Sequence, residues 1–347
     1  MHVSLDSNVI IADRWLRSRH LEALLDYLDR TNSKLFLHEV VVAETKARIK
    51  QQFVKAINSI ITATREAERI GVLGISMPEE HNLVTLSMLN WEATFDLWVE
   101  SNAKVIELDN VLLPEITRRA VHRIPPFTPD GEEFRDAIIW LGLLRFVSQN
   151  CSVPEVAFIS QNVKQFASPN KVDLDSVLLK DAEEAGIDVQ YFSSLDTFIA
   201  SRATPIAHVT REWIESHLGN RDLQALIHGY FRLSNPDFFV PTQSYEHRFQ
   251  PVEVPALLDV TSSLVDFFIW QDKSGSLTLF MSFDVIATGV AECESVLSAS
   301  ARYETEQDPR WIELPCRAHR TLEVSADIEG VSITELSVDA SEPVWGY

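Results

Sequence analysis

Up to about Ala200, the chain alternates between short apolar runs and long amphipathic stretches. The apolar run from Val3 to Ile11 is broken by polar residues, which predicts a buried strand with Asp6 at its C-terminal end. We predict further strands at residues 35–37, 156–160 and 187–192, and helices at 21–28, 39–69, 77–124, from 132, 175–186 and from 194. Such alternation predicts an α/β domain, with a parallel sheet covered by helices on both faces in three layers, α/β/α.

Aromatic residues recur at helical spacing within the predicted 77–124 helical segment. Trp91, Phe95 and Trp98 are four and three residues apart and share one helix face. A cofactor site is one interpretation, but we predict that these side chains pack in the core.

The pattern changes after residue 203. Predicted helices at 211–218 and 222–230 form a connector over residues 204–249. Alternating apolar runs follow at 264–270, 277–290, 296–303, 321–328 and 331–338, and the turn 271–275 predicts a hairpin. We therefore predict a domain at residues 1–203 with a helical insertion at about 46–124, and a mostly antiparallel β domain at 250–347.

Length and composition agree with two globular domains, because 347 residues exceed what one core usually serves. No apolar run is long enough to cross a membrane and no signal peptide is indicated, so we expect a cytoplasmic protein without a membrane partner. Cys151, Cys293 and Cys316 lie far apart, which argues against a zinc site, and we expect buried thiols.

The net charge of −21 is unfavourable for a protein that binds nucleic acid, because such affinity comes largely from Lys and Arg contacts to phosphates. Local basic patches matter more than the total. Basic residues gather at Lys46, Arg48, Lys50 and Lys55, and again at Arg118, Arg119, His122 and Arg123. Solvated helix faces are the alternative interpretation of both groups.

Four polar residues are expected at the edge of the sheet where the parallel strands end. Asp6 and Asn162 follow predicted strands, and Glu44 and Asp136 lie early in predicted helices that begin at the same edge. Three carboxylates and an amide oxygen suit Mg²⁺ or Mn²⁺. Such an ion can activate a water and offset charge on a phosphodiester, so these residues are our catalytic candidates.

The segments around these residues resemble the motifs of PIN domains, and the closest similarity is to larger bacterial PIN-like proteins with a helical insertion. The match extends over about residues 1–200 in the right order. The segments that carry it are Leu5-Asp6-Ser7-Asn8-Val9-Ile10, Val41-Val42-Ala43-Glu44-Thr45, Pro125-Pro126-Phe127, Phe134-Arg135-Asp136-Ala137 and Phe158-Ile159-Ser160-Gln161-Asn162.

The resemblance implies a PIN-like fold and a metal-dependent nuclease. It makes Asp6, Glu44 and Asp136 metal ligands, with Ser7 or Asn8 supporting the first of them. Many PIN domains have Asp where Asn162 stands, and this departure weakens the case for two metal ions. Residues expected to contact the substrate are Asn8, Arg48, Arg123, Arg135 and Lys164.

Each candidate also has a structural interpretation. Asp6 is suited to capping the next turn, Glu44 to pairing with Arg48, and Asp136 to the dipole of its helix. Asn162 is equally suited to a turn. We expect His38 to be a structural histidine rather than a ligand.

Our leading hypothesis is an endoribonuclease, since PIN-like bacterial proteins of this kind generally act as RNases in toxin or antiphage defence systems. A DNA nuclease uses the same carboxylates and stays an alternative. A non-catalytic scaffold, favoured by Asn162 and the net charge, is another class, and a phosphatase with Asp6 as nucleophile is a weaker one. For the acidic C-terminal domain we expect a protein partner, self-association or inhibition of the nuclease half.

Overall fold

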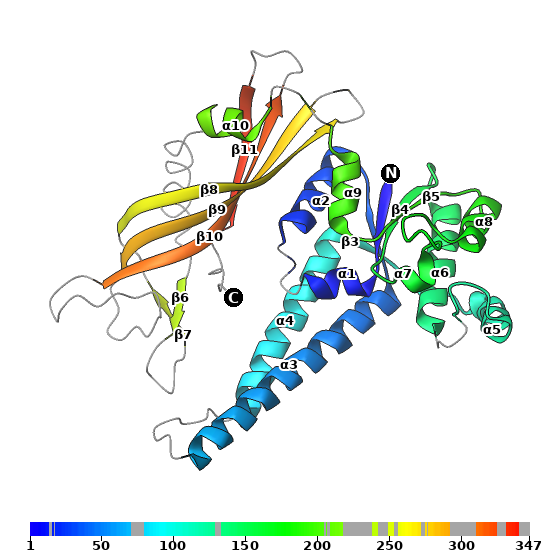
Figure 1. The fold of residues 1–347 in the computed structure, drawn as a ribbon, viewed down its shortest axis with the longest axis horizontal. Coiled ribbons are helices and arrows are strands. Elements are labelled where there is room, and N and C mark those ends of the chain that lie inside the picture. Colours follow the sequence, from blue (N-terminus) through cyan, green and yellow to red (C-terminus); the bar gives the residue numbers. More distant parts are fainter. Residues whose placement is uncertain are drawn as a thin grey trace. The chain divides into compact units, whose positions relative to one another are not determined.

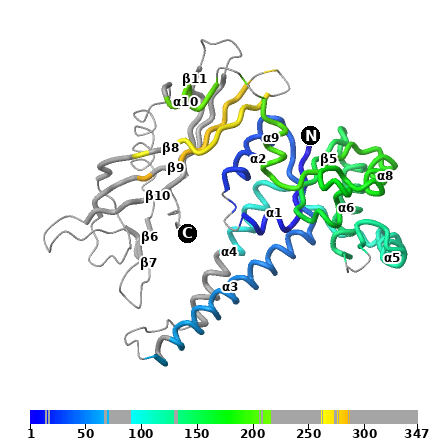
Figure 2. Tube along the Cα trace, viewed as in Figure 1, coloured from blue at the N-terminus to red at the C-terminus, as the bar shows by residue number. Residues whose placement is uncertain are grey.

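The chain forms two compact units, Met1–Ser201 and Arg202–Tyr347. The computed structural model describes residues 1–13, 16, 18–70, 80–128, 133–204, 206, 209–217, 238–241, 249–252, 256–271, 275, 277–291, 310–324 and 331–339 (Figures 1 and 2). The division between the units lies two residues before the boundary predicted at residue 203.

A five-stranded sheet forms the centre of the N-terminal unit (Figure 1). Its order is β3-β2-β1-β4-β5, and all neighbouring strands pair in parallel, as predicted. The central strands are buried on both faces, which explains why most of their residues are apolar. The strands are β1 (His2–Leu5), β2 (Leu35–His38), β3 (Ala103–Ile106), β4 (Glu155–Ile159) and β5 (Asp188–Phe192).

The first strand is shorter than the sequence predicted. It ends at Leu5, because the Asp6 side chain accepts a hydrogen bond from the backbone N–H of Ser7 and caps a short helix, α1 (Ser7–Ala12). The apolar residues Val9 and Ile10 are therefore buried from a helix rather than from a strand. Asp6 nevertheless lies at the C-terminal end of β1, as predicted.

Helices cover both faces of the sheet, which confirms the three-layer α/β/α prediction. On one face, Trp140 of α6 contacts Phe158 of β4, with ring centroids 5.8 Å apart. Phe158 and Ile159 are adjacent in β4 and therefore face opposite sides of the sheet. Phe192 of β5 pairs with Ile159, so it lies on the other face, where it contacts Phe198 of α9. The helices of this unit are α2 (Arg19–Arg30), α3 (Glu39–Arg69), α4 (Glu80–Asn102), α5 (Leu113–His122), α6 (Phe134–Asn150), α7 (Val163–Phe166), α8 (Ser176–Glu184) and α9 (Leu195–Arg202).

The insertion at about 46–124 is not wholly helical, which corrects the sequence prediction. After α4 the chain forms the edge strand β3, the 3-10 turn η1 (Asn110–Leu112) and α5. The sequence around Asn102 and Ala103, where α4 ends and β3 begins, contains no Gly or Pro. The end of the helix therefore gave no signal in the sequence. The predicted packing of Trp91, Phe95 and Trp98 is confirmed: adjacent rings stack at 5.0 and 6.4 Å, and Phe95 is fully buried.

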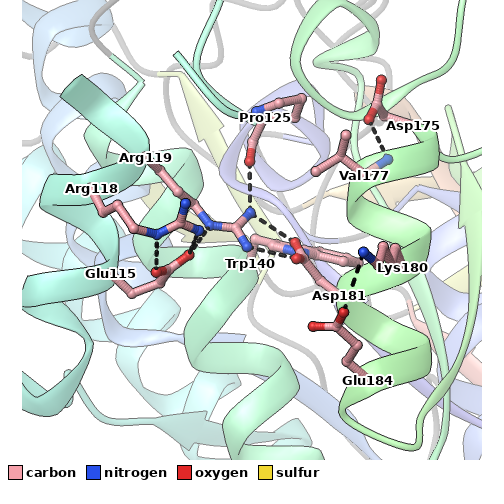
Figure 3. A network of polar contacts seen from close by, with 10 residues as sticks. All are labelled: Glu115, Arg118, Arg119, Pro125, Trp140, Asp175, Val177, Lys180, Asp181 and Glu184. Atoms are coloured by element: carbon pink, nitrogen blue, oxygen red, sulfur yellow. Dashed lines mark hydrogen bonds and ion pairs between the residues drawn. The ribbon is translucent and has the colours of Figure 1, made fainter. Parts of the chain in front are cut away.

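Arg119 holds α5 against the core of the unit (Figure 3). It is 4% exposed and donates to both carboxylate oxygens of Asp181 at 2.6 and 2.7 Å. It also donates to Glu115 and to the carbonyl of Pro125, each at 2.7 Å. The indole N–H of Trp140 donates to Asp181 at 3.1 Å. Arg119 is therefore a structural residue, and the interpretation of the second basic group as a phosphate-binding patch is wrong for it.

Replacing Arg119 with Met is expected to lower the free energy of unfolding by about 3 kcal/mol, because it leaves the half-buried Asp181 carboxylate without its guanidinium partner. Arg118→Met is the matched control on the same helix. The Arg118 side chain is 51% exposed and pairs with Glu115 at the surface, so we expect a much smaller loss than for Arg119→Met. Urea denaturation measures both, and equal losses would contradict the structural role of Arg119.

The C-terminal unit contains a four-stranded antiparallel sheet of order β11-β10-β9-β8. The predicted hairpin is confirmed: Gln271 pairs with Leu277, and Gly275 in the turn has a φ of +89°, which favours glycine. The elements of this unit are α10 (Arg211–His217), β6 (Phe238–Pro241), β7 (Phe249–Val252), β8 (Ala256–Gln271), β9 (Leu277–Ala291), β10 (Arg310–Val324) and β11 (Val331–Asp339).

The segment between the two predicted domains is only partly helical. The predicted connector at 204–249 contains α10 but also β6, which pairs with β7 in a two-stranded sheet, so it is not wholly helical. The predicted helix at 222–230 and run at 296–303 lie outside the described residues. Among the helices that are described, none is long and apolar enough to cross a membrane.

Cys151 differs from the expectation of a buried thiol. It follows the last residue of α6 and is half-buried, and its burial raises the pKa of the thiol. Cys293 and the side chain of Cys316 lie outside the described part of the structure.

Candidate metal centre

Four predicted residues meet at the C-terminal edge of the parallel sheet. Asp6 follows β1 directly, and Asn162 lies three residues after the end of β4. Glu44 lies early in α3, which begins immediately after β2, and Asp136 is in the first turn of α6. Side chains from segments far apart in the sequence thus lie together at one edge of the parallel sheet.

Asp6 is the most constrained acid of the group. Its side chain is 1% exposed, and Oδ1 accepts from the backbone N–H of Ser7 at 2.7 Å. Oδ2 accepts from the hydroxyl of Ser160 at 2.6 Å, the amide of Asn8 at 2.9 Å and the amide of Asn162 at 3.2 Å. With donors on both oxygens, the carboxylate has one orientation.

Asn162 links Asp6 to Asp136. Its amide nitrogen donates to Asp136 Oδ1 at 3.3 Å as well as to Asp6. Asn162 is the N-cap residue of α7, but its side chain makes no capping hydrogen bond. The turn interpretation therefore does not account for the side chain, which is directed toward the two acids.

Glu44 joins the group through Ser7. The Ser7 hydroxyl donates to Glu44 Oε2 at 2.9 Å and lies 3.4 Å from Asp6 Oδ1. The other oxygen, Oε1, forms an ion pair with Arg135 and lies 3.7 Å from Nε of Arg48. Both guanidinium side chains are more than half exposed, at 55% and 53%, so they also face solvent.

The acids interact electrostatically. Burial is the main reason that the pKa of Asp6 is raised, and the charge of Glu44 adds to the effect despite the hydrogen bonds from Ser160 and Ser7. Burial, and then the charge of Asp6, raise the pKa of Asp136 to about 7. Removing protons from the cluster therefore creates repulsion, which a bound cation would relieve.

The chemistry of these donors fits a hard divalent cation, since Mg²⁺ and Mn²⁺ prefer carboxylate and amide oxygens. Within the described part of the chain, however, no three acidic, histidine or cysteine side chains are grouped closely enough to form a ready-made metal site. Asp6 and Asp136 share one donor, whereas Glu44 is paired with Arg135. Glu44 is therefore the acid of the three whose charge is offset by an ion pair with an arginine.

The remaining predicted residues lie at different places. Asn8 supports Asp6, and its Oδ1 accepts from the backbone of Gln161 at 3.1 Å. Lys164 is exposed on α7, two residues beyond Asn162. Arg123 is exposed at the C-terminal cap of α5 in a left-handed conformation. Their roles in substrate binding stay predictions.

His38 is buried, with 2% exposure, and its burial lowers the pKa to about 4, so it is neutral at pH 7. Its Nδ1 accepts from the backbone N–H of Val40 at 3.2 Å. Its Nε2 lies against Gly142, where a Cβ would stand only 2.6 Å away. These contacts agree with the expected structural role.

The sequence prediction missed two supporting residues. Ser160 is fully buried, donates to Asp6, and accepts from the backbone N–H of Asn162 at 3.1 Å. Tyr191 of β5 donates to the carbonyl of Ser160 at 2.7 Å. A small polar residue at the end of an apolar strand was a signal for Ser160, whereas Tyr191 is an ordinary strand residue in the sequence.

Replacing Asn162 with Asp is expected to tighten Mn²⁺ binding, because a carboxylate would replace the amide between Asp6 and Asp136. Gln161→Glu is the matched control, since it adds the same charge at an exposed neighbouring position. Calorimetric titration with Mn²⁺ should give roughly a tenfold lower dissociation constant for Asn162→Asp, as expected for a change beside metal ligands. Equal affinities for the two variants would mean that Asn162 lies away from the ion.

Comparison with known families agrees with this geometry. A family model described as PIN domain matches residues 3–166, which contain all four residues of the cluster. No curated protein and no solved structure matches the chain.

Proposed function

Because the N-terminal unit of this chain belongs to the PIN domain family, whose members are generally nucleases, we propose that the protein is a metal-dependent endonuclease that cleaves RNA. Asp6, Glu44 and Asp136 would hold Mg²⁺ or Mn²⁺. The observation that carries the proposal is the pair of shared donors. Asn162 joins Asp6 to Asp136, and Ser7 joins Asp6 to Glu44.

The bound ion supplies a water activated for attack on the phosphodiester and offsets charge on the phosphate. The protein's own residues position the ligands. Ser160, Asn8 and Asn162 fix the orientation of Asp6, and Ser7 holds Glu44 beside it. Hydrogen bonds of this kind restrict the orientation of a ligand that would hold the ion.

Arg48 and Arg135 are suited to a second role. They flank Glu44, and each exposes more than half of its side chain. Guanidinium groups bind phosphate oxygens in a planar, bidentate manner. Their pairing with Glu44 leaves both groups open to solvent, so both would be able to contact the phosphate next to the cleaved bond.

The choice of RNA over DNA comes from the resemblance to bacterial PIN-like proteins, as does a role in toxin or defence systems. The test is cleavage of labelled RNA, single-stranded DNA and double-stranded DNA in Mn²⁺, in Mg²⁺ and in chelator. We expect internal cleavage of RNA that requires the ion. Faster cleavage of either DNA would reassign the substrate, and cleavage that persists in chelator would contradict the metal-dependent mechanism.

A non-catalytic scaffold is the second candidate. Two observations favour it: the described residues contain no ready-made metal site, and the net charge is −21. Mn²⁺ titration separates the two functions. The nuclease requires Mn²⁺ binding that is lost in Asp6→Asn, whereas a scaffold predicts no binding that depends on Asp6.

A further inference from the structure

The helix that carries Glu44 continues as a basic segment without acids. Between Thr45 and Arg65 the chain has no Asp or Glu, yet it contains Lys46, Arg48, Lys50, Lys55 and Arg65. In a chain with a net charge of −21, this is a local reversal of sign. It lies on one helix, α3, and begins one residue after an acid of the candidate metal centre.

The positions of these residues around α3 separate two faces. At about 100° per residue, five side chains lie within about 40° of the direction of Glu44. All five are exposed and polar: Arg48, Gln51, Lys55, Asn58 and Thr62.

Close to Glu44, the opposite side of α3 is directed toward the protein. It carries Ile49, which is 3% exposed, and Lys46, whose Nζ forms an ion pair with Asp96 of α4 at 2.5 Å. Lys46 is therefore neutralised by a neighbouring helix, and the outward face is the one available to a ligand.

The outward face has the length of a short nucleic-acid strand. Glu44 and Lys55 are about 16 Å apart along the axis at 1.5 Å per residue, and Thr62 lies about 27 Å from Glu44. At the spacing of about 3.4 Å per nucleotide along one strand of duplex DNA, the distance from Glu44 to Lys55 corresponds to roughly five nucleotides. A hollow of about 1090 Å³ lies against the same stretch. Its lining includes Gln51, Lys55, Asn58 and Thr62 of this face, together with Val54 and, at its far end, Glu66.

We propose that the face of α3 formed by Arg48, Gln51, Lys55, Asn58 and Thr62 binds a single RNA strand and leads it to the acid cluster. The inference rests on the proposed nuclease function and extends it to a substrate that occupies several nucleotides on one side of the cleaved bond. Arg48 and Lys55 neutralise phosphates, and Gln51, Asn58 and Thr62 provide uncharged hydrogen-bonding groups. The two positive charges are complementary to phosphates, and Gln, Asn and Thr side chains commonly contact the phosphate and sugar oxygens of a nucleic-acid strand.

The test compares Lys55→Gln with Lys180→Gln, which removes the same charge from the exposed face of α8. Binding of a labelled 16-nucleotide single-stranded RNA is measured by fluorescence anisotropy at several salt concentrations, without divalent ions so that no cleavage occurs. We expect Lys55→Gln to weaken binding about fivefold and to reduce the magnitude of the salt slope by about 0.7, corresponding to one lost phosphate contact. Lys180→Gln should bind as the wild type does.

Equal binding by the two variants, or no binding of RNA by the wild type, would overturn the proposed surface. Adding Mn²⁺ to the wild-type complex tests the nuclease function separately. Cleavage of the RNA together with an unaltered Lys55→Gln variant would reject the surface and keep the nuclease. Weaker binding by Lys55→Gln without any cleavage by the wild type would keep the surface and reject the nuclease.

Discussion

Asp6→Asn and Asp136→Asn are each expected to reduce RNA cleavage by about 10²- to 10³-fold, because a catalytic ion contributes several kcal/mol to the transition state and each variant removes a charged ligand. The two variants should differ in stability. The Asp6 carboxylate accepts hydrogen bonds from Asn8, Ser160 and Asn162 on a single oxygen. If the NH₂ group of an asparagine side chain replaced this oxygen, it would face three hydrogen-bond donors. Asp6→Asn should therefore also cost about 1–3 kcal/mol of folding free energy.

Asp188→Asn provides the matched control. Asp188 is exposed at the start of β5, and the strands run in parallel, so it lies at the sheet edge opposite the acids. Single-turnover cleavage in Mn²⁺ should be unchanged in this variant. Wild-type cleavage rates in Asp136→Asn would remove Asp136 from the metal centre.

The sequence was sufficient to predict four of the five strands and the edge of the sheet at which Asp6 and Asn162 lie, for one physical reason. Buried parallel strands are short apolar runs, and their C-terminal ends share an edge, so a polar residue after each run predicts a common site. Asp6 and Asn162 were found in this way. The PIN domain assignment, first made from the same segments, is supported by the family match over residues 3–166.

The parts that were missed depend on tertiary contacts. Strand β3 has four residues at an edge of the sheet, and its apolar pattern is too short to distinguish it from the preceding helix. Arg119 looks like any surface arginine in sequence, and only the fold brings Asp181 to it. The ion pair between Arg135 and Glu44 likewise joins residues 91 positions apart.

The charge distribution along the chain is uneven, so the net charge does not describe α3. Acids outnumber bases by 21 over the chain, but residues 45–65 contain only bases among their charged residues. A nucleic acid responds to the local field within about 8–10 Å at physiological salt. A nuclease function is therefore compatible with an acidic chain when the strand follows α3.

Asp136→Asn is expected to stabilise the metal-free protein, and the gain should grow as the pH rises from about 4 to about 7. Burial and the charge of Asp6 raise the pKa of Asp136 from 3.8 to about 7. Within this window the folded chain keeps a proton on Asp136 that the unfolded chain has released, so a rising pH favours unfolding. The penalty is absent below the unfolded pKa and complete above about pH 7, where it amounts to about 4 kcal/mol.

The quantity to measure is the difference in stability between Asp136→Asn and the wild type. Stability alone is not enough, because His38 changes it with pH in the opposite direction to Asp136. Burial lowers the pKa of His38 to about 4, so this residue favours folding as the pH rises from about 4 to 6.5. Both proteins contain His38, and its contribution cancels in the difference. Calorimetric melting in chelator at pH 5, 6 and 7.5 should show a melting-temperature gap that widens with pH. Mn²⁺ should narrow or reverse the gap at pH 7.5, since only the wild type keeps all three carboxylates for the ion. A constant gap across this range would mean that Asp136 is not held in a repulsive, buried cluster.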